Sequence, residues 1–131
     1  MKKSLDFLKP VFRRYLEIKL VYFFGSRAGQ AGGPASDYDF AVYFGGIRSE
    51  RMFSIKLDLI AKMTRMLDTD RVDIVILNVA GSPELKYAVV KEGVLIFERE
   101  PFKVIVEPKI LNEYFDFHMM LSKHGLTKAI A

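Results

Sequence analysis

The chain has 131 residues and a formal net charge of +4, a length that suits one domain with its own core and excludes two ordinary domains. Half of the residues are apolar and 27% are charged, which excludes a disordered chain. The sequence contains no cysteine, so disulfide bonds and thiolate metal sites are excluded. No apolar run is long enough to cross a bilayer, and the first residues lack the apolar stretch of a signal peptide. We therefore expect a single cytoplasmic domain over residues 1–131.

The basic residues raise the isoelectric point to about 9.3, but they are scattered along the sequence, mostly between apolar residues of expected helices. Such a distribution is more typical of a solvated surface than of a nucleic-acid-binding face. The sequence also lacks the aromatic and glycine motifs with which proteins stack bases. We therefore expect no direct binding of nucleic acid.

Three elements are predicted in the first third of the chain: a helix over 4–18, a strand over 19–24 and a second strand over 37–44. Apolar residues at offsets of three and four predict the helix, and β-forming residues predict the strands. Because proline removes an interior hydrogen bond, Pro10 requires that the helix begins near Lys9 or is kinked there. The residues from Gly25 to Ser36 are expected to form a loop.

The remainder predicts a helix over 49–67, a strand over 71–78, a helix to about Glu92, a strand over 94–98 and a helix or broken helix over 102–124. Ser82 is a candidate cap for the second of these helices, because Pro83 follows it at the first helical position. The order α, β, β, α, β, α, β, α predicts an α/β (α+β) fold with a mixed sheet of about four strands and helices largely on one side. Residues 101–131 are expected to form a C-terminal helical segment.

Two aspartates at the start of the second strand suggest a metal site. Asp37 and Asp39 would point to the same face of the strand, where a divalent cation between them makes two adjacent carboxylates tolerable. Just upstream, Gly25 lets the backbone approach a ligand, and Ser26 offers a hydroxyl and an N–H to a phosphate oxygen. Together these groups are typical of a site for a nucleoside triphosphate with magnesium.

Asp73 interrupts an otherwise apolar strand, and a buried unpaired carboxylate is costly. One interpretation places Asp73 on an exposed face or pairs it with Arg71 or Arg27. Because Asp37 and Asp39 are also present, we favour a third carboxylate on the adjacent strand.

The spacing of the first motif resembles that of a known superfamily. Gly25-Ser26, ten intervening residues and then Asp37-Tyr38-Asp39 resemble the G-S-x10-D-x-D signature of the DNA polymerase beta-like nucleotidyltransferases, and the wider pattern is similar to the minimal nucleotidyltransferases. The resemblance implies their fold and covers most of the chain.

The sequence departs from that pattern in the loop. The family usually has G-S-x-A-x-G, whereas here Gly29 comes one position early and Gln30 occupies the position of the second glycine. The Ser36-Asp37 end of the motif is intact, and Ser36 is expected to bond local backbone.

The resemblance implies a role for each site residue. Asp37 and Asp39 would hold the magnesium ion that accompanies ATP, and Asp73 would join them in holding a second magnesium ion that lowers the pKa of the attacking hydroxyl. Gly25 and Ser26 would bind the triphosphate.

Two further groups of side chains have open or minor roles. Arg27 either adds charge to the phosphate site or is solvated. His118 and His124 have no carboxylate pattern around them, so we expect no chemistry from them.

The resemblance also implies a partner. Minimal nucleotidyltransferases are commonly paired with a HEPN-domain protein, a small helical RNase toxin, and serve as antitoxins by transferring AMP to a tyrosine of it. Two alternatives stay open: an antitoxin that neutralises the HEPN toxin by contact alone, and nucleotidyl transfer to a small-molecule acceptor. A homodimer and a hetero-oligomer are both compatible with the sequence.

The C-terminal segment carries an apolar cluster at Phe115, Phe117, Met119, Met120 and Leu121. We expect this segment to fold back onto its own domain, and a surface for a partner is the alternative.

Overall fold

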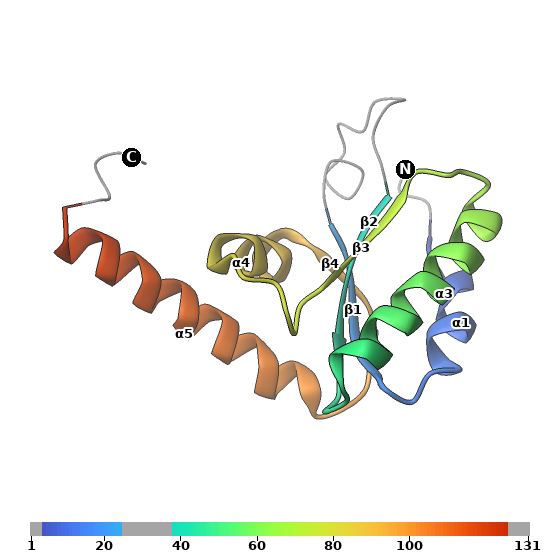
Figure 1. Ribbon diagram of the computed structural model, residues 1–131, viewed down its shortest axis with the longest axis horizontal. Coiled ribbons are helices and arrows are strands. Elements are labelled where there is room, and N and C mark those ends of the chain that lie inside the picture. Colours follow the sequence, from blue (N-terminus) through green and yellow to red (C-terminus); the bar gives the residue numbers. More distant parts are fainter. Residues whose placement is uncertain (1–3, 25–37, 126–131) are drawn as a thin grey trace.

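The computed structural model describes residues 4–24 and 38–125, and its elements follow the predicted order (Figure 1). In chain order they are the 3-10 helix η1 (Asp6–Leu8), α1 (Lys9–Arg13), β1 (Ile18–Phe24), β2 (Tyr38–Phe44), α3 (Ser49–Leu67), β3 (Val72–Ile76), α4 (Pro83–Glu92), β4 (Val94–Glu98) and α5 (Phe102–Lys123).

The four strands form one mixed sheet in the order β3-β2-β1-β4. Strand β1 is antiparallel to both of its neighbours, β2 and β4, whereas β2 and β3 are parallel. Parallel neighbours need a crossover connection, and the 19-residue helix α3 supplies it between β2 and β3. The predicted α/β fold with a four-stranded mixed sheet is therefore confirmed.

The first face of the sheet is covered by η1, α1 and α3. Their buried side chains pack against those of alternate strand residues, and together they form the larger hydrophobic core. Helix α3 contributes Met52, Ile55, Leu59 and Met63, which recur at the spacing of one helical face. Phe12 of α1 and Phe97 of β4 place their rings 5.7 Å apart across this core.

The second face is covered by α4 and α5, which lie on the other side of the sheet from α1 and α3 (Figure 1). Val89, Val106 and Ile110 of these helices pack there against Leu20 and Tyr22 of β1. The prediction that the helices lie largely on one side was therefore wrong. Strand β1 is buried on both faces, which is why its apolar residues run on without alternation.

Local chemistry explains the helix boundaries. Helix α1 begins at Lys9, as one of the two predicted alternatives required, and Pro10 lies in its first turn, where its missing N–H has no intrahelical partner to lose. The predicted span of 4–18 was too long, because η1 and the five-residue α1 end at Arg13. The Ser82 side chain accepts a hydrogen bond from the Leu85 N–H at 3.1 Å and caps α4 as predicted. Helix α5 continues through Pro108.

Helix α5 contributes to the core with its first half. Its buried residues are Val106 and Ile110, and its second half extends away from the sheet (Figure 1). Phe115 of the apolar cluster still contacts Tyr87 of α4, with ring centroids 6.2 Å apart, whereas Met119 is 72% exposed. The expectation that this segment folds back onto its own domain therefore holds for its first part and was wrong for Met119 and Met120. None of the helices in the described part of the chain has the length and apolar character needed to span a bilayer.

Candidate active site

Two of the predicted carboxylates come together at one edge of the sheet. Asp39 of β2 and Asp73 of β3 are register partners in the parallel pair, and partners on neighbouring strands point to the same face. Asp39 is partly exposed and Asp73 is exposed. The two carboxylates therefore lie side by side where a ligand from solvent can reach them.

Strand alternation separates these carboxylates from the larger core. Tyr38 and Phe40 point to the opposite face, where Tyr38 stacks on Phe23 with ring centroids 6.0 Å apart. Phe40 is fully buried. The apolar neighbours of Asp39 thus fix the register of β2, and a slip by one residue would bury its carboxylate.

Asp73 lies on the predicted adjacent strand, beside Asp39. Because Asp73 is exposed, its charge is not buried. This agrees with the interpretation that placed Asp73 on an exposed face of the strand. Its position opposite Asp39 is what makes it a candidate for chemistry, and the catalytic role of both residues stays a prediction.

The remaining predicted site residues lie outside the described residues: Gly25, Ser26, Arg27 and Asp37, together with the Gly29-Gln30 departure. The described chain stops at Phe24 and resumes at Tyr38. Phe24, the last described residue before this gap, is the register partner of Asp39. Within residues 4–24 and 38–125 no three His, Asp or Glu side chains gather into a metal site.

Gly93 lies beside the end of β1, next to Phe24, and no local signal in the sequence predicted this contact. Its N–H donates to the Val89 carbonyl oxygen at 2.9 Å. A Cβ built on Gly93 would lie 2.4 Å from that oxygen and 3.3 Å from the Phe23 carbonyl oxygen. Glycine therefore allows α4 to turn tightly into β4 against the end of β1.

A partly buried hydrogen bond lies one row further along the same face. The Tyr22 hydroxyl donates to Glu107 Oε2 of α5 at 2.6 Å, and Tyr22 is the register partner of Ala41. Burial, reinforced by the Glu107 carboxylate, raises the pKa of Tyr22 far above its ordinary value. Tyr22 is thus a permanent donor that joins α5 to the sheet beside the candidate site.

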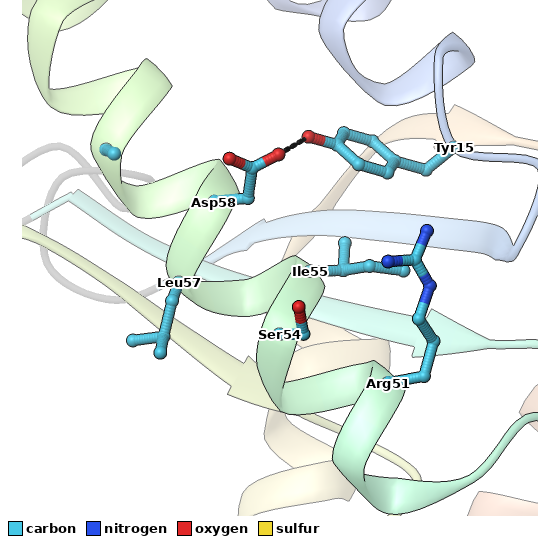
Figure 2. Close-up of a pocket in the computed structure, with 7 residues that line it drawn as sticks. Tyr15, Arg51, Ser54, Ile55, Leu57 and Asp58 are labelled. Carbon is cyan, nitrogen blue, oxygen red and sulfur yellow. Dashed lines mark hydrogen bonds between the residues drawn. The ribbon is translucent and has the colours of Figure 1, made fainter.

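A hollow of about 370 Å³ lies on α3 next to Tyr15 (Figure 2). The Tyr15 hydroxyl donates to Asp58 and accepts from Lys62 Nζ at 2.8 Å. The hydrogen bond from Tyr15 is the main cause that lowers the pKa of Asp58. The hydrogen bond to Tyr15 is the main cause that raises the pKa of Lys62. These bonds attach the residues after α1 to α3, so the hollow borders a structural contact on the face opposite to Asp39 and Asp73.

A comparison with protein families identifies the class of the chain. The family described as Polymerase beta, Nucleotidyltransferase matches residues 7–102, which include the whole sheet with Asp39 and Asp73. The chain therefore belongs to the polymerase beta nucleotidyltransferase family. No match was found among curated proteins.

Solved structures share the fold over nearly the whole chain. A chain of a toxin–antitoxin complex with AMP-PNP is 23% identical, with a TM-score of 0.75 and 96% of this chain and 97% of that chain covered. A chain from the complex of tri-AMPylated Shewanella oneidensis HEPN toxin with MNT antitoxin is 24% identical, with a TM-score of 0.65 over 91% and 88%. A chain from an MntA–HepT toxin–antitoxin complex is 23% identical, with a TM-score of 0.67 over 93% and 92%.

Proposed function

We propose that this chain is an antitoxin that transfers AMP from ATP to a hydroxyl, that of a tyrosine, on a HEPN RNase toxin. The observation that carries the proposal is the Asp39–Asp73 pair, two accessible carboxylates on one face of a nucleotidyltransferase sheet. The AMP-PNP complex and the tri-AMPylated HEPN toxin among structures of the same fold support ATP as the donor and the toxin as the acceptor.

The carboxylate pair suits magnesium. Magnesium prefers oxygen ligands and is usually held by one or two carboxylates together with substrate phosphates, and Asp39 and Asp73 offer two carboxylates that are open to solvent. Asp37 would complete the set. Bound there, magnesium would neutralise phosphate charge and lower the pKa of the acceptor hydroxyl.

The residues of the chain then have positioning roles. Gly25 and Ser26 would hold the triphosphate so that its α-phosphorus faces the acceptor, and Arg27 would add positive charge there. The acceptor oxygen forms a bond to the α-phosphorus, the bond between the α- and β-phosphates breaks, and pyrophosphate leaves. The hydroxyl proton passes to solvent, and Asp73 would join Asp37 and Asp39 in holding the second magnesium ion.

The test is to incubate the chain with ATP, magnesium and its toxin and to weigh the toxin by mass spectrometry. The proposal predicts one or more added AMP groups, a loss of the adduct with Asp39→Asn, and an unchanged adduct with Asp68→Asn. Asp68 is the matched control, because it is an exposed aspartate in a left-handed backbone conformation that asparagine also adopts.

Two other outcomes would replace the proposal. An unmodified toxin that is still neutralised by the Asp39→Asn variant would indicate an antitoxin that acts by contact alone. Turnover of a small acceptor in the absence of the toxin would indicate a small-molecule nucleotidyltransferase.

A further inference from the structure

The second half of α5 presents a surface that the proposed function does not use. Asp116, Met119, Met120 and Lys123 recur at the spacing of one helical face, and all four are exposed. With Ser122 and His124 they line a hollow of about 590 Å³. We call these four residues the α5 stripe.

The opposite side of the same helix is already occupied. On that side Tyr114 stacks on Tyr87 of α4 with ring centroids 3.8 Å apart and contacts His118. Glu113, which lies one turn before Asp116 at the start of the stripe, forms an ion pair of 2.8 Å with Lys86 of α4. These contacts hold α5 against α4 and orient the α5 stripe away from the domain. The stripe is therefore accessible along its whole length, and nothing in the described part of the chain covers it.

The residues of the α5 stripe are arranged so that the stripe is complementary to a second copy of itself. Met119 and Met120 form its centre, an anionic residue lies one turn before them, and a cationic residue lies one turn after them. If a second copy of α5 is laid on it in the antiparallel direction, the four methionines meet at the centre. Asp116 of each copy then faces Lys123 of the other, at both ends.

We propose that the α5 stripe is the interface of a homodimer with two-fold symmetry, in which α5 pairs antiparallel with α5 of a second copy. A two-fold interface requires one patch that is complementary to itself, and the order of charge, apolar centre and opposite charge meets this condition. Methionine side chains adapt their shape and fill such a centre well. The charge pairs select this partner and direction, because like charges would meet in the parallel arrangement.

The contact is small, since one half of one helix from each copy takes part, and small interfaces are typical of weak association. We therefore expect a monomer–dimer equilibrium that depends on concentration. Sedimentation velocity of the full chain alone, from about 10 µM to about 1 mM, would show a sedimentation coefficient that rises toward that of a dimer. A monomer throughout this range overturns the proposal.

Exchanging the two charges tests the direction of pairing. Asp116→Lys places two lysine side chains together at both ends of the interface, and Lys123→Asp places two aspartates together, so each variant should dimerise about tenfold more weakly than the wild type. The double variant, with both exchanges, restores the opposite charges and should dimerise as the wild type does. An equimolar mixture of the two single variants should form heterodimers.

Because both residues are exposed, thermal unfolding should be unchanged in every variant and serves as the control for folding. Single variants that dimerise like the wild type would place the dimer contact elsewhere and reject the stripe. If the wild type stays monomeric and the Asp116→Lys variant no longer binds the toxin, the stripe is a contact surface for the toxin and the homodimer is rejected.

Discussion

Replacing Gly93 by alanine should destabilise the fold and displace the end of β1 that adjoins the candidate site. The new Cβ would lie 2.4 Å from the Val89 carbonyl oxygen, whereas ordinary contacts begin at roughly 3.4 Å, so α4 and the turn must separate by about 1 Å. The backbone of Gly93 is extended and suits alanine, so the cost arises from the contact alone. Overpacking against rigid backbone costs about 1–3 kcal/mol.

Two other glycines provide the control. A Cβ on Gly46 or on Gly81 would have no atom within 4 Å, so Gly46→Ala and Gly81→Ala leave packing unchanged. All three substitutions reduce the entropy of the unfolded chain similarly, which stabilises a protein by about 0.4–1 kcal/mol. The difference between Gly93→Ala and the two controls therefore isolates the contact.

Urea unfolding followed by circular dichroism measures the free energy of unfolding of the four proteins. We expect Gly93→Ala to fall below both controls by more than about 1 kcal/mol. Because the Phe23 carbonyl oxygen is also close, at 3.3 Å, AMP transfer should decrease as well. A Gly93→Ala variant as stable as Gly81→Ala would refute the steric argument.

Three further predictions concern single groups. Tyr22→Phe leaves the Glu107 carboxylate without its donor and should lower the free energy of unfolding in urea by about 1–3 kcal/mol; a loss below about 0.5 kcal/mol would contradict the role given to this bond. Asp58→Asn should lower the melting temperature at pH 7. Because the pKa of Asp58 is depressed in the folded chain, the difference in melting temperature from the wild type should shrink as the pH falls through and below 3.8, the ordinary value. A difference that stays constant with pH would contradict the role given to the Asp58 carboxylate. Asp73→Asn should reduce the rate of AMP transfer by about 100-fold or more, whereas a rate like that of Asp68→Asn would remove Asp73 from the site.

The sequence predicted the sheet well because its signals are local. The apolar periodicity of α3 and the cap at Ser82 fix their elements without reference to the rest of the chain. Asp39 and Asp73 could be paired from sequence because the order of the elements placed their strands together. The local signals therefore sufficed for the framework of the candidate site.

What could not be predicted depends on contacts between distant residues. The apolar residues of β1 are buried on both faces, but the expected helices alone did not show which of them would cover the second face. The bond between Tyr22 and Glu107 joins residues 85 positions apart, and no local pattern predicts it. The direction of α5 is likewise set by the stack of Tyr114 on Tyr87.

The parallel pairing of β2 with β3 also links ligand binding to the lifetime of the folded chain. Asp39 and Asp73 are separated by the whole α3 crossover, so the unfolded chain holds no such pair. Any cation or nucleotide complex bound there stabilises the folded state by mass action, by about 2.7 kcal/mol at a concentration one hundred times its dissociation constant. A protease that cleaves unfolded chains would then degrade the protein fastest when its ligand is scarce, and its abundance would follow the ligand supply.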